Sequence, residues 1–272
     1  MMSRLSKLML IALCTVILGA ARAHSGPVED GVAAYDRGDY ESAMQLLRPA
    51  AERGDPTAES TLGAMYENGR GVARDLRSAL NWYRRAAHHG SAPAQNSIGV
   101  MHTLGRGVNR NPVAAVRWYR LAAGQGFAIA QYNLGVVYEN GWGVRQSHAR
   151  AEKWYRAAAN QGLEAAEHNL AVMYTFGRGL PVDYARAAEW YRRAARDGYA
   201  LAQNNLGMMY LNGIAMTRNY VLAYMWFSLS AEQGNEDAAR NLDLLELRMS
   251  PEEIAEARQR AYLQKLRRGE GT

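Results

Sequence analysis

Cysteine is almost absent from this chain of 272 residues, in which Cys14 is the only one. It lies in residues 1–23, which we predict to be a secretory signal peptide. Two basic residues precede the apolar run Leu8–Ala20, and a small-residue exit ends at Ala23. Cleavage after Ala23 leaves a chain without cysteine, which excludes disulfide scaffolds, thiol nucleophiles and cysteine-ligated metals.

Two other interpretations of this segment are an uncleaved membrane anchor and a lipoprotein signal that ends at Cys14. An anchor needs about 20 apolar residues, whereas Leu8–Ala20 supplies 13. A lipoprotein signal prefers a small residue before its cysteine, where this chain has Leu13. We therefore expect a mature protein that is periplasmic or secreted and that has no membrane span.

An excess of charge of one sign is also missing. After residue 23 the chain has 29 basic and 26 acidic side chains, and this near balance gives no reason to expect nucleic acid as a partner. Lysine is rare in the mature chain, and neither Lys153 nor Lys265 completes an S-x-x-K motif. The sequence also has no G-x-S-x-G, H-E-x-x-H or G-x-x-x-x-G-K-[ST] motif. We predict no catalytic residues, no metal site and no cofactor.

Glycine, in contrast, is abundant and periodic. Six glycines are spaced 36 residues apart: Gly54, Gly90, Gly126, Gly162, Gly198 and Gly234. Alanine, leucine and tyrosine recur at the same period, and so do five tryptophans: Trp82, Trp118, Trp154, Trp190 and Trp226. Self-similarity at a period between about 20 and 50 residues is typical of a solenoid.

Each unit of 36 residues predicts two helices, here called helix A and helix B. In the first helix A, four apolar residues form one stripe at helical spacing: Ala58, Leu62, Met65 and Tyr66. Gly63 leaves room for helix B to approach closely. A single helix pair cannot bury its own apolar faces, so the units must stack, and we expect a large aromatic from each helix B to feed one continuous core.

The period divides the mature chain into a degenerate N-terminal repeat, five full repeats and a C-terminal part. The boundaries are residues 24–53 for the first, 54–233 for the five repeats (54–89, 90–125, 126–161, 162–197 and 198–233), and 234–268 for a partial repeat with a capping helix. The capping helix is predicted over Pro251–Arg267, because Ser250 supplies an N-cap, Pro251 a first-turn proline and Glu253 an acid at N3.

The repeated pattern resembles that of the Sel-1-like repeat family, a relative of the tetratricopeptide repeat. The pattern is A-x-x-x-L-G-x-M-Y-x-x-G-x-G-V followed by A, W-Y and A-A, as in Ala58–Ala87, and it covers about Tyr35–Leu247. The resemblance implies an all-α, right-handed α-solenoid that acts as an adaptor. Bacterial members are often exported and tied to envelope signalling, exopolysaccharide control or contact with host cells. The fold does not identify the partner.

The turns that follow helix A contain Gly-Arg-Gly in three repeats: Gly69–Gly71, Gly105–Gly107 and Gly177–Gly179. Because they recur at the repeat period, we interpret them as structural turns and not as phosphate sites, and we expect their arginines to lie in water. In the fifth repeat, Ile214–Met216 replaces the Arg-Gly-Val of the earlier repeats, so this turn departs from the pattern.

The histidines do not form a metal motif. His102 occupies the repeating tyrosine column and is expected to fill the core. His88 and His89 end a helix B, where a cationic side chain suits the helix dipole. Some cysteine-rich members of the family are described as weak penicillin-binding or β-lactamase-like proteins, but they carry repeat-spanning cysteine pairs that this mature chain lacks.

A second face of helix A is the candidate binding surface. At 100° per residue, positions equivalent to 57, 60, 64, 67 and 68 lie beside the buried stripe, and position 61 lies between the two sets. In tetratricopeptide arrays helix A lines the concave surface. Our peptide-binding candidates on this face are Asn96, Tyr132, Asn133, His168, Asn169, Phe176, Asn204 and Asn205.

Two interpretations of the asparagine columns stay open. A carboxamide both donates and accepts, so a ladder of asparagines can pair with the backbone of an extended peptide without reading its sequence. Alternatively, these asparagines bond neighbouring repeats or cap local backbone.

We therefore predict a non-enzymatic scaffold or adaptor of the bacterial cell envelope, with a regulatory role, that binds a protein or peptide through the concave helix-A surface. The main alternative is a secreted factor that engages host proteins, since the same signal peptide serves both. A β-lactamase-like or cell-wall-acting enzyme is less favoured.

Overall fold

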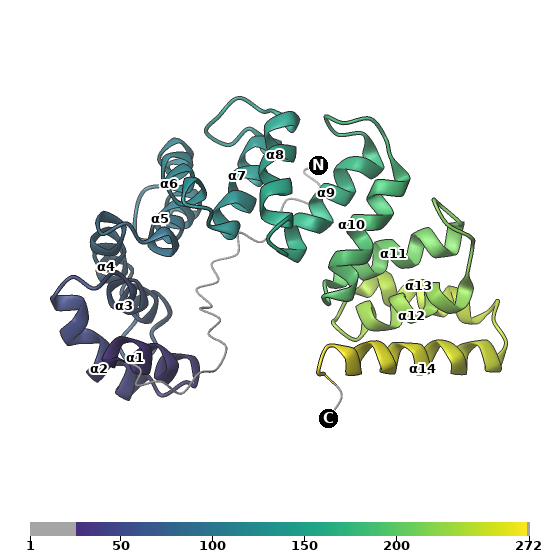
Figure 1. Cartoon of the computed structure of the whole chain (residues 1–272), viewed down its shortest axis with the longest axis horizontal. Coiled ribbons are helices and arrows are strands. Elements are labelled where there is room, and N and C mark those ends of the chain that lie inside the picture. Colours follow the sequence, from purple (N-terminus) through teal and green to yellow (C-terminus); the bar gives the residue numbers. More distant parts are fainter. Residues whose placement is uncertain (1–25, 271–272) are drawn as a thin grey trace. The chain divides into compact units, whose positions relative to one another are not determined.

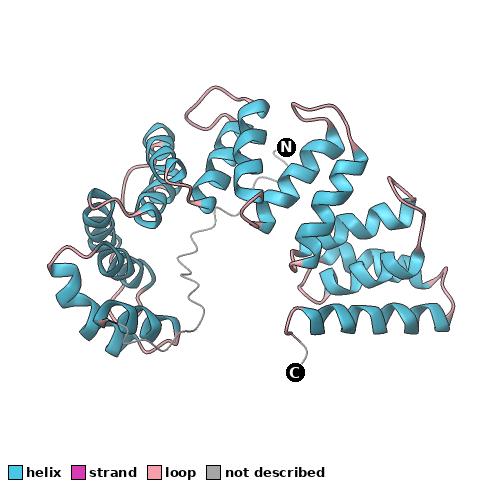
Figure 2. Ribbon diagram, in the orientation of Figure 1, coloured by secondary structure: helices cyan, strands magenta, loops and turns pink. Residues whose placement is uncertain are grey.

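The computed structural model describes residues 26–270, and every regular element in that range is a helix (Figure 2). The all-α prediction is confirmed. The predicted signal peptide lies outside the described residues. The chain divides into two compact units, one that ends at Gln146 and one that begins at Ser147.

The first unit is a series of antiparallel helix pairs joined by short turns (Figure 1). Its helices are α1 (Pro27–Asp36), α2 (Tyr40–Glu52), α3 (Pro56–Asn68), α4 (Leu76–His88), α5 (Ala92–Leu104), α6 (Pro112–Gly124) and α7 (Ala128–Asn140).

The second unit continues the same alternation of helix A and helix B. Its helices are α8 (His148–Ala159), α9 (Glu164–Phe176), α10 (Tyr184–Arg196), α11 (Ala200–Asn212), α12 (Tyr220–Ala231), α13 (Glu236–Glu246) and α14 (Pro251–Arg267). The bounds of α14 and the capping box between Ser250 and Glu253 are as predicted.

Helix A ends where a glycine takes the left-handed conformation. In α3 this residue is Gly69, at φ 69° and ψ 37°, and its backbone N–H donates to the carbonyl of Met65. The chain then turns and enters helix B through a side-chain cap, such as Asp75 before α4. In the departing fifth turn, Ala215 takes φ 58° and is the one non-glycine residue with positive φ in the described range.

The large aromatic that helix B buries most deeply is the residue after the tryptophan. Tyr83 is 1% exposed and Tyr119 is fully buried, whereas Trp82 and Trp118 are only half-buried. A glycine in helix A makes this possible, because a Cβ built on Gly63 would lie 2.6 Å from the ring of Tyr83. The close approach expected at Gly63 is confirmed, and the group that fills the space is the tyrosine ring.

Each of these buried tyrosines has a polar partner on helix A. The hydroxyl of Tyr83 donates to Glu67 Oε2 at 2.9 Å, and the hydroxyls of Tyr119 and Thr103 lie 3.0 Å apart. Where helix B carries Phe227, with no hydroxyl, the position 16 residues earlier is Leu211. A buried tyrosine hydroxyl is therefore paired with a polar residue 16 positions earlier, and a phenylalanine at the same position is paired with an apolar one.

The arginines of the Gly-Arg-Gly turns are not simply solvated, contrary to expectation. Arg70 donates from Nη1 to the hydroxyl of Tyr35 at 2.9 Å, and Nη1 of Arg106 lies 3.3 Å from Oε1 of Glu67. Arg70 and Arg106 thus reach back to the preceding repeat, since the stacked turns bring them beside residues about one period earlier.

Candidate binding site

The asparagine columns of helix A form hydrogen bonds between successive repeats. Nδ2 of Asn133 donates to Oδ1 of Asn96 at 2.9 Å, and Nδ2 of Asn241 donates to Oδ1 of Asn204 at 3.1 Å. In each pair, the residue equivalent to position 61 bonds the residue equivalent to position 60 of the repeat before it. The geometry matches the second interpretation of these columns, in which the asparagines join neighbouring repeats.

The candidates differ widely in accessibility. Phe176, at the end of α9, is 65% exposed, and the guanidinium of Arg178 lies over its ring. Asn204 and Asn205 are half-buried. The other candidates are buried: Asn96, Tyr132, Asn133, His168 and Asn169. Buried carboxamides that already pair with one another do not present their donors to a peptide, so a role for them in peptide binding stays a prediction.

His168 takes the place of an asparagine in this network. Its Nε2 lies 3.1 Å from Nδ2 of Asn205, and its Nδ1 lies 3.2 Å from Oδ1 of Asn169. Because the amide of Asn205 donates to Nε2, the proton of the neutral ring lies on Nδ1 and is donated to Asn169. Burial lowers the pKa of His168 to about 4, so the ring is neutral at physiological pH.

A second column joins helix A to the following helix B through charged pairs. Oε1 of the fully buried Glu59 lies 2.9 Å from Nε of Arg85, and its Oε2 lies 2.8 Å from Nδ1 of His89. His89 lies at the end of helix B, as expected, and it also pairs with the buried carboxylate of Glu59.

Glu167 occupies the corresponding position in the second unit, with one partner fewer. Its Oε1 lies 2.9 Å from Nη2 of Arg193, but Asp197 stands where the first pair has a histidine. Desolvation raises the pKa of Glu167 to about 7; Arg193 opposes this shift, and the charges of Asp197 and Glu164 add to it.

In the remaining repeats the charged pair is replaced by two glutamines. Nε2 of Gln125 donates to Oε1 of Gln95 at 2.8 Å, and Nε2 of Gln233 donates to Oε1 of Gln203 at 2.9 Å. These neutral pairs require no ionised group to be desolvated, which distinguishes them from the pairs of Glu59 and Glu167.

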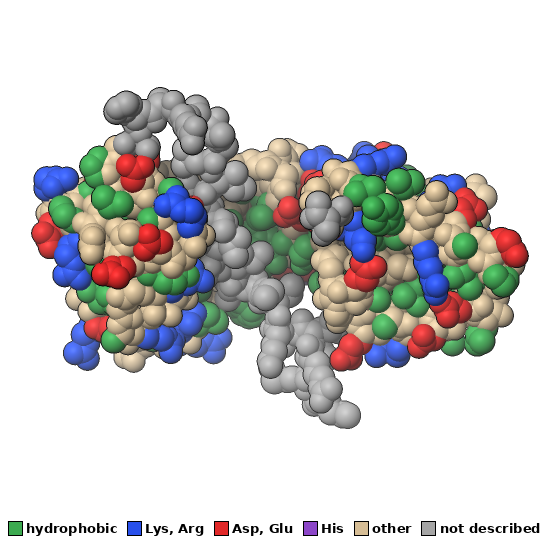
Figure 3. All heavy atoms as spheres, turned by 90° about the horizontal axis from the view of Figure 1, so that it is seen from below, with side chains coloured by type: hydrophobic (Ala, Val, Ile, Leu, Met, Phe, Trp, Pro, Cys, Tyr) green, Lys and Arg blue, Asp and Glu red, His purple; other side chains and the backbone are tan. Residues whose placement is uncertain are grey.

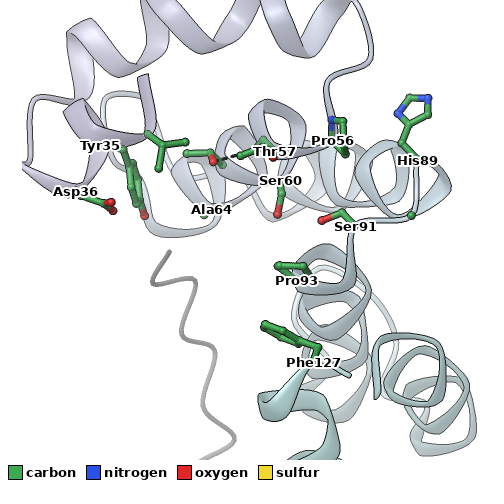
Figure 4. Close-up of a pocket in the computed structure, with 13 residues that line it drawn as sticks. Tyr35, Asp36, Pro56, Thr57, Ser60, Ala64, His89, Ser91, Pro93 and Phe127 are labelled. Atoms are coloured by element: carbon green, nitrogen blue, oxygen red, sulfur yellow. Dashed lines mark hydrogen bonds between the residues drawn. The ribbon is translucent and has the colours of Figure 1, made fainter. Parts of the chain in front are cut away.

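In the first unit the helix-A face forms a cavity of about 460 Å³. Tyr35 of α1, Ser60 and Ala64 of α3, Pro93 of α5 and Phe127 before α7 border one space (Figure 4). Thr57 and Thr61 extend this wall along α3. Positions 57, 60, 61 and 64 thus line the cavity in this repeat, while most of their equivalents in the next three repeats are buried.

The lining is mainly apolar with a few polar groups. Tyr35, Pro93 and Phe127 supply ring faces, and the exposed carboxylate of Asp36 lies at the edge. The hydroxyl of Thr61 is already used, since it donates to the carbonyl of Thr57 at 2.8 Å. Such a surface suits a large apolar side chain of a partner better than a charged one.

The sequence did not predict most of this lining. Tyr35 and Asp36 belong to α1, whose sequence departs from the repeat, and Phe127 lies just before α7, outside the columns that we selected. Pro93 shares the column of Thr57 but was not among the candidates. The sequence did contain a feature that α3 and α5 share: proline follows the N-cap within two residues in both helices.

Metal-binding clusters and membrane-spanning helices are two further features that bear on function. Residues 26–270 contain no group of three or more His, Cys, Asp or Glu side chains placed to hold a metal ion. None of the helices in this part of the chain has both the length and the apolar character that a membrane span requires. On the face in Figure 3, basic and acidic side chains are interspersed.

Comparison with known families finds the Sel1 repeat, whose model matches residues 28–55, 56–91, 92–127, 128–163, 164–199 and 200–235. The first match covers all but the first residue of α1 and the whole of α2. Our own division of the chain, with five full repeats between partial units, stays a prediction. A comparison with curated proteins gave no match.

Solved structures that are similar to this chain include the following three. A protective antigen of uropathogenic Escherichia coli with an SLR fold is 37% identical, with a TM-score of 0.75 over 90% of this chain and 53% of the antigen. The chain therefore spans about half the length of that antigen. A Sel1 repeat protein from Oxalobacter formigenes is 30% identical, with a TM-score of 0.75 over 88% of this chain and 97% of that one. The immunity protein Pa5087 of Pseudomonas aeruginosa, 20% identical with a TM-score of 0.54 over 75% of this chain and 81% of its own, shares the fold alone.

Proposed function

Because the chain belongs to the Sel1 repeat family, a family of repeat scaffolds, we propose that it is a non-catalytic adaptor that binds a protein or peptide along helix A. The observation that carries this proposal is the cavity of about 460 Å³ on the helix-A side of α1, α3 and α5. Elsewhere on this face the polar side chains pair with each other, whereas here ring faces and small side chains border an open space.

The partner contributes a large apolar side chain that lies between Tyr35 on one side and Pro93 with Phe127 on the other (Figure 4). Fixed turns and buried tyrosines hold these helices, so the surface is preorganised and binding needs little ordering of the scaffold. Phe176 offers a further exposed contact on α9.

A cavity-filling variant tests the site. Thr57 lines the cavity and is exposed, so T57W fills the space without disturbing the core. The matched control is R77W, at an exposed position of α4 outside the cavity. Tagged wild type and both variants are used to isolate partners from the cell envelope, with quantitative mass spectrometry. We expect a protein that is enriched with wild type and with R77W and lost with T57W; equal recovery by all three contradicts the proposed site.

We further propose that the protein acts outside the cytoplasm as a regulator of an envelope process. The signal-peptide pattern of residues 1–23 supports export. Cell fractionation and N-terminal sequencing test it: the expected product begins at His24 and lies in the periplasm or the medium. A full-length cytoplasmic product contradicts this part of the proposal.

A second candidate function is contact with host proteins after secretion. The observation in its favour is the 37% identity to an antigen of uropathogenic Escherichia coli strains. Mature protein in the medium favours this function, and retention in the periplasm favours the envelope role.

A further inference from the structure

The second unit contains another cleft, away from the helix-A face. Its volume is about 510 Å³, and it lies between α10 and α14, above α12. The apolar floor includes Met225 and Trp226 of α12, which are 7% and 6% exposed. Trp226 is the one buried member of its column, and here it forms the base of a cleft.

The wall of the cleft exists because the last helix is longer than a repeat helix. α14 has 17 residues, whereas α12 has 12. Its first half packs Ala257 against the core cluster around α12. Its second half continues beyond this contact, and the guanidinium of Arg268 lies over Gly198, where an added Cβ would be only 2.7 Å from Nη1. Leu263, at 46% exposed, stays open to solvent along this wall.

The cleft is basic, with four arginines and one glutamate in its lining. The glutamate is engaged, since Oε1 of Glu256 lies 2.7 Å from Nη2 of Arg260. Within residues 26–270, the side chains of Arg192, Arg196 and Arg267 make no hydrogen bond or ion pair. Three guanidinium groups therefore face one apolar floor without an acidic partner.

Arg192 departs from its own repeat column, and this departure places it in the cleft. At equivalent positions, an arginine of helix B donates to the tyrosine hydroxyl 18 residues later: Arg48 to Tyr66 at 3.4 Å, Arg120 to Tyr138 at 2.7 Å and Arg156 to Tyr174 at 2.8 Å. Arg192 and Tyr210 both line the cleft, but neither side chain bonds the other or any described residue. Both groups are thus available to a ligand.

We propose that this cleft binds an acidic peptide segment that carries a large apolar side chain. The apolar group would lie on Met225 and Trp226, and the adjacent carboxylates would accept hydrogen bonds from Arg192 and Arg196, whose planar guanidinium groups suit a carboxylate. Gln259 and Gln264 also line the cleft and offer carboxamides to a peptide backbone. The short, bounded floor favours a few side chains over a lipid surface or a nucleic acid, which needs an extended basic face.

Fluorescence polarisation with a defined probe tests this site. The probe is the fluorescein-labelled peptide acetyl-DDLFDD, and the comparison peptides are acetyl-NNLFNN and acetyl-DDSSDD. The variants are R192Q/R196Q and L263D, with R218Q/R248Q as the matched control, because Arg218 and Arg248 lie outside the cleft. We expect wild type and the control to bind acetyl-DDLFDD at least about tenfold more tightly than R192Q/R196Q and L263D, with binding weakened by added salt.

Removal of the carboxylates, as in acetyl-NNLFNN, or of the apolar side chains, as in acetyl-DDSSDD, must also weaken binding. Equal binding of acetyl-DDSSDD shows attraction to charge alone, and equal affinity of R192Q/R196Q for acetyl-DDLFDD shows that the arginines do not contribute; both results overturn the proposal. Co-sedimentation with phosphatidylglycerol vesicles, without binding of the peptide, also overturns it and assigns the cleft to an anionic lipid surface. T57W should bind the probe as wild type does, which separates this site from the helix-A cavity.

Discussion

Nε2 of His168 lies 3.1 Å from Nδ2 of Asn205, so one repeat bonds the next through a neutral imidazole at the position where other repeats use asparagine. The ring also lies 5.7 Å from Tyr191 and 5.3 Å from Tyr199, measured between ring centroids. No acidic side chain is hydrogen-bonded to it, so protonation in this place costs free energy without an ionic gain.

The first prediction concerns the pH dependence that this contact creates. The pKa of His168 falls from 6.5 to about 4 on folding, so its contribution to stability is complete above pH 6.5 and is lost as the pH falls toward 4. Replacement H168N places at this position the carboxamide that Asn96 and Asn204 supply in other repeats. We expect wild type to lose up to about 3 kcal/mol more than H168N between these pH values. Urea unfolding from pH 8 to pH 4 measures the difference, and parallel curves contradict it.

Two buried glutamates should respond in opposite ways to the same substitution. The pKa of Glu167 rises from 4.5 to about 7 on folding, so the unfolded carboxyl ionises first and stability is lost as the pH rises from 4.5 to 7. E167Q removes this loss and should stabilise the protein at pH 8 by up to about 3 kcal/mol.

Glu59 supplies the matched comparison. It pairs with both Arg85 and His89, so E59Q removes two charge-assisted contacts and should destabilise the protein by about 1 kcal/mol at pH 8. Thermal unfolding of E59Q, E167Q and the wild type at pH 8 measures the two changes in stability. A stabilised E59Q, or an E167Q as unstable as E59Q, contradicts the difference that we assign to the partners.

The fifth helix-A turn contains a site where glycine should improve the protein. Ala215 takes φ 58°, a conformation that costs a residue with a Cβ roughly 1–2 kcal/mol. A215G should therefore stabilise by about 1 kcal/mol. The reverse change in the same turn, G213A, places a Cβ at φ 68° with neighbours at ordinary contact distance, so it should destabilise by a similar amount. Chemical denaturation that ranks the two variants the other way contradicts the turn geometry.

The helix-A glycine opposite the buried tyrosine should not tolerate a methyl group. A Cβ on Gly99 would lie 2.6 Å from the ring of Tyr119, so G99A should destabilise by about 1–3 kcal/mol through overpacking. Gly124 ends α6 and has nothing within 4 Å of an added Cβ. G124A serves as the control and should be neutral or stabilising by up to about 1 kcal/mol. Similar unfolding midpoints for both variants contradict the tight packing.

Local rules were enough to predict the helices. The glycines that end helix A, the caps of helix B and the capping box before α14 each act within a few residues, so the 36-residue period shows them directly. The contacts between repeats could not be predicted in the same way. The bonds of Arg106 to Glu67 and of Asn205 to His168 depend on the angle between stacked helices, which spacing along one helix does not determine.

The binding surface was predicted only in part for the same reason. The face with positions 57, 60 and 64 does line a cavity in the first unit, between α1, α3 and α5. In the next three repeats most of these positions are buried, and asparagines chosen for their chemistry bond each other, as Asn133 bonds Asn96. Tyr35 and Phe127 complete the cavity from segments that the repeat pattern does not describe.

Site-specific photocrosslinking in living cells tests the central claim most directly. A benzoylphenylalanine residue is placed at Thr57, in the cavity, or at Arg77, on the exposed side of α4. We expect one discrete crosslinked protein from the Thr57 position, absent from the Arg77 position. The same bands from both positions, or crosslinks at Arg77 alone, would contradict the proposal that this scaffold binds its partner through the helix-A cavity.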